Sequence, residues 1–133
     1  MIIISPADHA GTKGKPGSQF TGSVYPYMTM PSTDGVTINT VNFTPCARTY
    51  WRHHEGGQIL IVLAGKGLIQ SEGGRVIVIR AGDTVWTPPG EHHWHGASLD
   101  SFMTHTAISL GTTVWAQEVS EDQFRAVPTD GDE

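Results

Sequence analysis

Short runs of alternating hydrophobic and polar residues cover most of the chain between residues 24 and 110. Such a two-residue period predicts half-buried β-strands. The predicted strands are 24–30, 35–43, 47–54, 58–64, 67–72, 75–79, 84–87, 92–96 and 101–110. Turn-forming residues separate many of them, at 32–35, 64–67, 73–74, 81–83 and 88–90. Many short strands joined by turns predict an all-β sandwich or barrel.

The two ends of the chain depart from this pattern. Residues 1–4 are apolar and predict a short first strand, and residues 5–23 carry turn residues without periodicity, which predicts an irregular arm. Ser120 followed by Gln123 fits a capping box and predicts a helix over 121–126. We therefore expect a single domain over 1–133, with a strand and arm (1–23), a barrel (24–115) and a short helix (120–127).

Composition restricts the class of protein and its partners. A chain of 133 residues is the length of one domain, and a net charge of −5 disfavours nucleic acid and anionic membrane surfaces as partners. The single cysteine, Cys46, excludes an internal disulfide and favours a reducing compartment. The apolar opening is too short for a signal sequence or a membrane span, so we expect a cytoplasmic protein.

Histidines gather within the predicted barrel. All except His9 lie between residues 53 and 105: His53, His54, His92, His93, His95 and His105. Because side chains alternate across a strand, His93 and His95 share one face, and Arg52 and His54 share another. Imidazoles on adjacent strands are typical of an open transition-metal site or of acid–base catalysis.

The residues around these histidines resemble the two sequence motifs of the cupin superfamily. Gly82, Pro88–Gly90 and His93 keep the spacing of the second motif, while Ala97 stands where the family often has Asn. In the first motif, the matches are His54, Gln58 and Gly65, and the departures are Cys46 in place of a glycine and Arg52 in place of the first histidine.

Residues 43–108 are similar to small bacterial single-domain cupins. These include the manganese-dependent (R)-selective hydroxynitrile lyases and the cupins found near or fused to carboxymuconolactone decarboxylase-like domains. The resemblance implies a cupin double-stranded β-helix, also called a jelly-roll barrel, with a short C-terminal helix. Small cupins commonly pair through outer sheets and arms, so a homodimer or homotetramer is expected.

The resemblance also implies a role for individual residues. His54, Gln58 and His93 would hold a divalent transition metal, with manganese expected first and iron, zinc or nickel also open. His95 and His105 would form the proton-transfer pair, in which a neutral His95 removes a proton while a cyanohydrin is cleaved to cyanide and an aldehyde. The residues expected on the substrate side are Arg52, Asn39, Val41, Tyr50 and Ser109.

Arg52 makes the metal prediction uncertain. A guanidinium keeps its proton and cannot ligate a cation; at about 5 Å from a divalent ion it is repelled by roughly 6 kcal/mol at an effective dielectric near 20. Four arrangements relieve this: the side chain swings out, a substrate carboxylate lies between the charges, no metal binds, or a bulge brings His53 inward as the missing ligand. A salt bridge from Arg52 to Glu55 or Glu91 is another alternative.

Three functions therefore remain open from the sequence. One is a metal-dependent lyase for a small organic substrate, and another is an oxygen-using cupin dioxygenase. The third is a non-catalytic or metal-poor cupin that binds a small anionic ligand through Arg52 and the histidines. The aromatic residues Trp51, Trp86 and Trp94 are predicted to fill the core rather than to contact a ligand.

Overall fold

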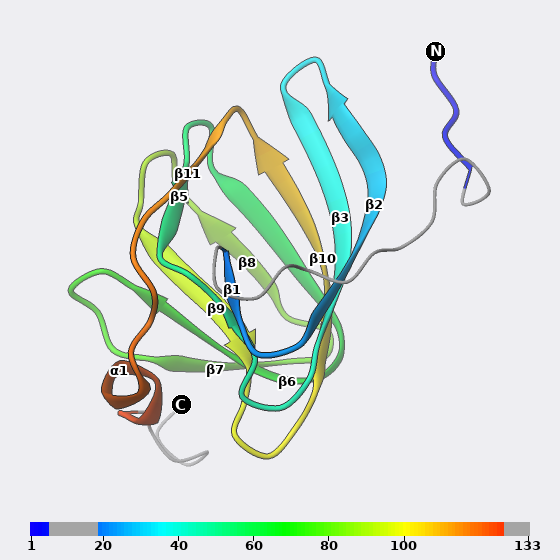
Figure 1. The fold of residues 1–133 in the computed structure, drawn as a ribbon. Helices are drawn as coiled ribbons and strands as arrows, with labels where there is room; N and C mark the ends of the chain where they lie inside the picture. The colour runs from blue at the N-terminus through cyan, green and yellow to red at the C-terminus, as the bar shows by residue number, and fades with distance from the viewer. Residues whose placement is uncertain (6–18, 127–133) are drawn as a thin grey trace.

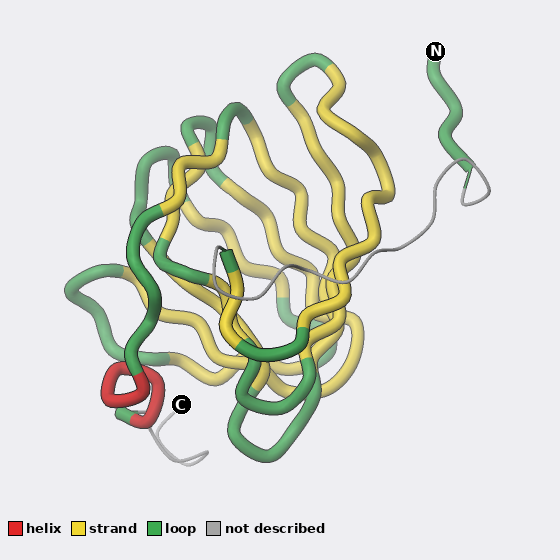
Figure 2. Tube along the Cα trace, in the orientation of Figure 1, coloured by secondary structure: helices red, strands yellow, loops and turns green. Residues whose placement is uncertain are grey.

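The computed structural model describes residues 1–5 and 19–126 and consists mostly of β-strands (Figures 1 and 2). The strands are β1 (Phe20–Thr21), β2 (Val24–Thr33), β3 (Val36–Phe43), β4 (Arg48–Thr49), β5 (Arg52–His54), β6 (Gln58–Ser71), β7 (Ile77–Arg80), β8 (Thr84–Thr87), β9 (His93–Ala97), β10 (Met103–Leu110) and β11 (Thr113–Trp115). The described helix is α1 (Glu121–Arg125), so none of the described residues forms a helix long enough to cross a membrane.

The strands form a sheet that curls into a barrel, as the sequence predicts. The main path of paired strands is β1-β4-β9-β6-β10-β3-β2, while β7 and β8 pair with β6, and β5 pairs with β9 and β11. All of these pairings between described strands are antiparallel. In Figure 1 the β2–β3 hairpin and α1 lie on opposite sides of the barrel.

Strand β6 joins the two sides of the barrel and corrects one prediction. Residues 64–67 do not form a turn, because β6 runs without interruption from Gln58 to Ser71. Its first half pairs with β8 and β10, and its second half pairs with β7 and β9. Gly65 makes the passage possible: its φ is +79°, and a Cβ there would overlap the carbonyl oxygen of Phe102.

Other element boundaries also differ from the sequence predictions. The predicted strand 47–54 is interrupted at Tyr50 and Trp51, which separates β4 from β5. Residues 1–4 are not a strand, and Met1, Ile2 and Ile3 are exposed, because none of the described strands pairs with them. Strand β11 was not predicted. Most of the predicted arm, residues 6–18, and residue 127 of the predicted helix lie outside the described residues.

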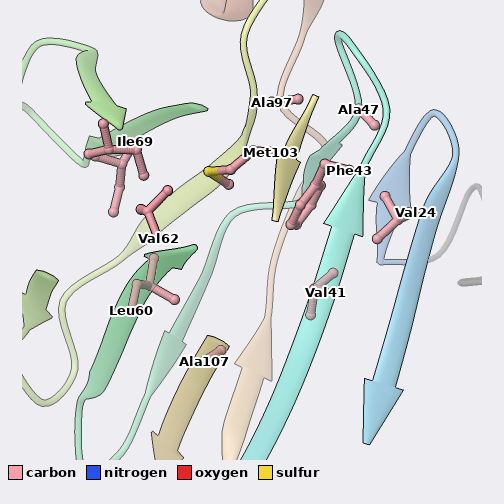
Figure 3. Close-up of a cluster of buried hydrophobic side chains, with 11 residues drawn as sticks. Val24, Val41, Phe43, Ala47, Leu60, Val62, Ile69, Ala97, Met103 and Ala107 are labelled. Atoms are coloured by element: carbon pink, nitrogen blue, oxygen red, sulfur yellow. The ribbon is translucent and has the colours of Figure 1, made fainter. Parts of the chain in front are cut away.

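Buried hydrophobic side chains form two clusters. One cluster lies between the facing strands of the barrel (Figure 3) and contains Val24, Val41, Phe43, Ala47, Leu60, Val62, Ile69, Ile79, Ala97, Met103 and Ala107. The other lies under α1 and contains Trp51, Leu68, Val76, Val78, Trp94, Val119 and Phe124. Trp51 and Trp94 are buried as predicted, whereas Trp86 is 53% exposed, so its assignment to the core was wrong.

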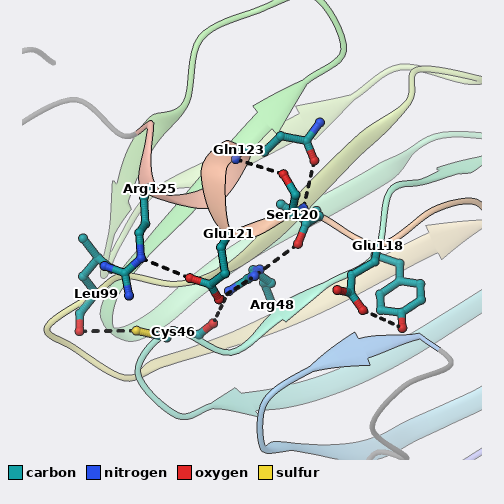
Figure 4. Close-up of polar contacts among 10 residues, drawn as sticks. Cys46, Arg48, Leu99, Glu118, Ser120, Glu121, Gln123 and Arg125 are labelled. Carbon is teal, nitrogen blue, oxygen red and sulfur yellow. Dashed lines mark hydrogen bonds and ion pairs between the residues drawn. The ribbon is translucent and has the colours of Figure 1, made fainter.

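Helix α1 begins with the predicted capping box and is fastened to the barrel by Arg48 (Figure 4). The Ser120 hydroxyl accepts a hydrogen bond from the Gln123 amide, and the Gln123 side chain accepts one from the Ser120 amide. The Arg48 guanidinium donates to the carbonyl of Val119 at 3.1 Å and to the carboxylate of Glu121 at 3.2 Å. These contacts hold α1 against the barrel, where the Phe124 ring packs on Trp94 with centroids 5.9 Å apart.

Candidate functional site

A cavity of about 250 Å³ lies inside the barrel and contains most of the predicted site residues. Strands from both sides of the barrel contribute to its wall. The lining residues are Gln19, Phe20, Pro26, Thr37, Asn39, Val41, Phe43, Thr49, Arg52, His54, Gln58, His95, His105, Ala107, Ser109, Thr113 and Trp115. Among the described residues that line this cavity there is no Asp or Glu, so Arg52 is its only side chain that is charged whatever the pH between 4 and 8.

Strand alternation brings the predicted histidines together in the interior. His54 on β5, His93 and His95 on β9, and His105 on β10 are all buried. The ring centroids of His54 and His93 lie 5.4 Å apart, and those of His95 and His105 lie 4.9 Å apart. Imidazoles from three separate strands therefore converge on one region, as the sequence predicts.

Arg52 points into the same interior and does not swing out. One of its terminal nitrogens lies 2.9 Å from Nε2 of His95, and its guanidinium carbon lies 4.9 Å from the centroid of the Trp115 ring. Among the described residues, Arg52 forms no salt bridge, so the alternatives with Glu55 and Glu91 were wrong. Burial lowers the pKa of Arg52 to about 9, which leaves it positively charged at neutral pH.

The hydrogen bond from Arg52 fixes the tautomer of His95. A guanidinium only donates hydrogen bonds, so Nε2 of His95 must accept with its lone pair. Burial and then the charge of Arg52 lower the pKa of His95 well below its usual value, so the ring is neutral and carries its proton on Nδ1. The one basic lone pair of His95 is therefore already occupied.

The other predicted site histidines are also neutral near pH 7, including His93, which is buried behind the cavity wall and is not one of the residues that line it. Burial first, and the positive charge of Arg52 second, lower the pKa of His54 to about 3, of His93 to about 4 and of His105 to about 3. Among the described residues, both ring nitrogens of His105 are buried without a hydrogen-bond partner. His105 thus carries a free lone pair that faces the interior.

The ligand types required for a divalent metal are present at His54, Gln58 and His93. Nδ1 of His93 lies 3.1 Å from the carbonyl oxygen of Glu91, which makes Nδ1 the donor and leaves a lone pair on Nε2. That Nε2 lies 3.2 Å from Oε1 of Gln58. His54 uses Nδ1 with the hydroxyl of Thr113 at 2.9 Å, and its Nε2 has no partner among the described residues. Hydrogen bonds from the outer ring nitrogen are typical of metal-ligating histidines.

The positive charge of Arg52 opposes the metal binding that these ligand types favour. Among the described residues, no group of three His, Cys, Asp or Glu side chains is arranged to hold a metal ion, so Gln58 would have to be the third ligand. Arg52 is close enough to lower the pKa of both His54 and His93 through its charge. The site therefore fits a divalent transition metal by donor type, with an affinity that Arg52 reduces.

The predicted substrate-side residues divide into two groups. Asn39, Val41 and Ser109 line the cavity, and Ser109 also accepts a hydrogen bond from Gln58 at 3.0 Å. Tyr50 does not line it, because the strand is interrupted there and the Tyr50 hydroxyl instead donates to Glu118 at 3.2 Å. The proposed inward rotation of His53 was wrong, since its ring stacks on His92 with centroids 4.6 Å apart.

Three of the lining residues that sequence analysis missed contact the histidines or Arg52 directly. Thr113 and Trp115 come from β11, whose register places them opposite His54 and Arg52. Thr49 lines the cavity in place of Tyr50, and its hydroxyl accepts a hydrogen bond from the amide of His95. Thr113, Val114 and Trp115 are all residue types that favour strands. This run was the available signal for a strand that contributes to the site.

Comparison with known families and proteins agrees with this geometry. Residues 39–104, from β3 to the beginning of β10, match the cupin domain family. The chain is 46% identical over 131 residues to an (R)-mandelonitrile lyase of Granulicella tundricola, an alignment that covers 94% of this chain and 99% of the relative. The relative is therefore matched over nearly its whole length.

Solved structures give the same fold. A cupin-like protein of Thermotoga maritima shares 36% identity and superimposes with a TM-score of 0.85, covering 92% of this chain and 96% of the other. A predicted oxalate decarboxylase of Thermotoga maritima shares 17% identity with a TM-score of 0.70, covering 84% and 100% of the two chains. At that identity the second likeness concerns the fold alone.

Proposed function

Because the chain belongs to the cupin family, we propose that its barrel interior is the active site of a lyase that cleaves a small cyanohydrin into hydrogen cyanide and an aldehyde. The observation that carries the proposal is the 46% identity to an (R)-mandelonitrile lyase over nearly all of both chains. The convergence of neutral imidazoles on a cavity of about 250 Å³ supports it, because this chemistry needs a base next to an enclosed small substrate.

We assign the base to His105 rather than to His95. Both were predicted to transfer protons, but the hydrogen bond from Arg52 occupies the lone pair that His95 would need. His105 has no partner for either ring nitrogen among the described residues. Its position next to the His95 ring, at 4.9 Å between centroids, leaves it inside the same cavity. His95 then positions Arg52 and takes no direct part in proton transfer.

His105 alone can carry out both proton transfers of the cleavage. Its ring nitrogen takes the hydroxyl proton of the cyanohydrin, and the oxygen then forms the carbonyl of the aldehyde. The bond between the carbinol carbon and the nitrile carbon breaks, and cyanide leaves with the bonding electron pair. Cyanide finally takes the proton back from His105, which restores the neutral imidazole.

In this proposal His54, Gln58 and His93 hold a divalent transition metal, with manganese expected. When bound, such an ion supplies Lewis-acid polarisation of the substrate hydroxyl oxygen. Thr113 and the carbonyl of Glu91 keep the outer nitrogens of the two histidines occupied, so that the inner nitrogens stay available. Asn39, Val41 and Ser109 also line the cavity and border the substrate in this proposal.

The activity is tested by incubating the protein with manganese and (R)-mandelonitrile and following benzaldehyde by absorbance. We expect release above the rate with manganese ions alone, and His105→Gln to lower kcat by at least about a hundredfold. His92→Gln is the matched control, because His92 lies just before β9 and outside the cavity, where its ring stacks on His53, so this variant should keep full activity. Absence of release above the metal-ion blank, in protein shown to contain manganese, would refute the lyase proposal.

The metal is tested separately with Arg52→His. This substitution removes the positive charge and adds a third imidazole, so manganese affinity should rise by about two orders of magnitude or more. Isothermal titration calorimetry of protein treated with a chelator measures the dissociation constant for each variant. If Arg52→His binds manganese no better than the wild type, the ion does not bind at His54, Gln58 and His93.

A further inference from the structure

Arg52 and Arg48 are both buried, but their surroundings differ in one respect. Arg48, 2% exposed, donates to the carboxylate of Glu121 and to the carbonyls of Val119 and Cys46. Arg52, 8% exposed, has only the neutral ring of His95 as a hydrogen-bond acceptor among the described residues. Buried charges in proteins are normally paired with an opposite charge. Arg48 has such a partner, and the lack of one at Arg52 among the described residues requires an explanation.

The side chain of Arg52 is held in a fixed orientation. His95 accepts from one terminal nitrogen, and the Trp115 ring lies under the guanidinium at 4.9 Å. Nε of Arg52 is buried and has no partner among the described residues. Arginine presents its N–H groups as a planar fork that matches the two oxygens of a carboxylate. The edge of the Arg52 guanidinium that carries Nε can still donate hydrogen bonds to a carboxylate in this way.

The cavity next to Arg52 has the size and lining that suit a small organic acid. Its volume is about 250 Å³, whereas an engineered apolar cavity of about 150 Å³ already accommodates benzene. Phe43, Val41 and Ala107 supply apolar wall, and no described Asp or Glu lines the cavity. Neutral histidine side chains surround the single guanidinium of Arg52. The cavity therefore contains one positive charge without a counter-ion.

From these observations we infer that Arg52 binds the carboxylate of a small monocarboxylic acid in this cavity, with the apolar body of the acid against Val41, Phe43 and Ala107. The anion supplies the missing acceptor for Nε and neutralises the buried charge. This inference does not rest on the lyase proposal, because it requires neither a metal nor turnover. It assigns to Arg52 a binding role at the position where the cupin motif has a metal ligand.

Benzoate and benzamide test the inference, because they have nearly the same shape and differ in charge. Isothermal titration calorimetry is carried out on wild-type protein in EDTA, so that no anion binds through a metal. We expect benzoate to bind at least about tenfold more tightly than benzamide, which is the usual size of a charge-assisted pair. Equal affinities for the two compounds, or no binding of benzoate at all, would overturn the inference.

Substitutions then locate the charge that matters. Arg52→Met keeps an apolar stem of similar length, and it should abolish the preference for benzoate while benzamide binding is retained. Arg75→Gln removes one positive charge from an exposed turn and should leave the preference intact. Retention of the preference in Arg52→Met would assign the anion to another group and so overturn the inference.

Arg52→Lys provides a second measurement in case Arg52→Met fails to fold. Lysine keeps the charge and loses the planar fork, so benzoate should bind more weakly than to the wild type and still more tightly than benzamide. Benzoate affinity equal to that of the wild type would exclude the fork geometry and overturn the inference. Since these titrations use metal-free protein and inert probes, their failure leaves the mandelonitrile assay unaffected, and the converse also holds.

Discussion

Arg52 is a buried positive charge whose nearest hydrogen-bond partner is neutral, and such a residue destabilises the protein that contains it. Burial lowers the pKa of Arg52 from its usual value to about 9, which means that the folded state disfavours the charged form by an amount on the order of a few kcal/mol. Part of this cost is offset by the hydrogen bond to His95 and the contact with Trp115. A residue that destabilises the empty cavity is typical of a binding site.

We therefore predict that Arg52→Met raises the melting temperature of the metal-free protein by about 4 °C, because it removes an uncompensated buried charge. Differential scanning calorimetry without ligand measures the change. Arg48→Met is the matched variant and should have the opposite effect, since it leaves the Glu121 carboxylate and the Val119 carbonyl without their donor. A lower melting temperature for Arg52→Met would mean that its contacts outweigh its desolvation.

The cavity histidines give a second prediction, for the effect of pH on stability. Burial and Arg52 lower the pKa of His54 and His105 to about 3 and of His93 to about 4, all below the value of 6.5 for an unfolded chain. As pH falls below 6.5, the unfolded state binds protons that the folded state does not. Stability is therefore complete above pH 6.5 and is lost as pH falls toward 4, by up to about 1.4 kcal/mol per pH unit for each histidine.

Melting temperatures recorded between pH 7.5 and 4 in EDTA check this dependence. His105→Phe should make the fall less steep by about one proton, because Phe replaces a buried group that becomes charged only on unfolding. A wild-type protein whose melting temperature is constant over this range would contradict the neutral assignment of the cluster.

At the scale of elements, the site depends on two strands whose roles are not visible in the local pattern. Strand β6 carries Gln58 into the cavity and continues past Gly65 into the other side of the barrel, where it pairs with β9 and its histidines. Strand β11 pairs with β5 and supplies Thr113 to His54 and Trp115 to Arg52. Both strands position the histidines and Arg52 through long-range pairing.

Gly65 is the residue of β6 that we expect to tolerate substitution least. A Cβ at this position would overlap the Phe102 carbonyl, and the φ of +79° is unfavourable for any other residue, so Gly65→Ala should lower the free energy of unfolding by more than about 3 kcal/mol. Gly73→Ala is the control: its φ is +82°, but a Cβ there meets no atom within 4 Å. It should cost only about 1–2 kcal/mol.

Urea denaturation of both variants separates the two contributions. If Gly65→Ala and Gly73→Ala lose the same stability, then only backbone strain matters at Gly65 and the close approach of β6 to Phe102 is absent. A larger loss in Gly65→Ala supports the role of this glycine in letting one strand serve both sides of the barrel.

For the molecule as a whole, the outer strand β2 is the element from which we predict contact with another chain. Along the main path of described strands, β2 is the last and pairs there only with β3. Met28 on this strand is 45% exposed. An exposed apolar side chain beside a strand at the edge of a described sheet favours a surface that a second chain covers.

We accordingly predict a homodimer formed through β2. Size-exclusion chromatography with light scattering should give twice the chain mass, and Met28→Glu should shift the protein toward the monomer without changing its fold by circular dichroism. The control is Asp100→Lys, which changes the charge of an exposed loop residue. Thr106→Glu is not a suitable control, because Thr106 is partly buried on β10. A wild-type protein that is monomeric at micromolar concentration would contradict this prediction.

The sequence by itself determined which neighbouring side chains share a face. Alternation along a strand is a local property of the backbone, so the common direction of Arg52 and His54, and that of His93 and His95, followed from their spacing. The capping box of α1 was equally local, because its two hydrogen bonds join residues three apart. The family resemblance added the barrel and the metal-ligand types, and the comparisons support the family.

Only the tertiary structure decided which of these side chains meet. The hydrogen bond from Arg52 to His95, which removes the basic lone pair of His95, joins residues 43 positions apart. The contribution of β11, the continuity of β6 through Gly65 and the exclusion of Tyr50 from the cavity likewise depend on how the sheet closes. Closure is set by pairings between distant segments, and a two-residue period contains no information about them.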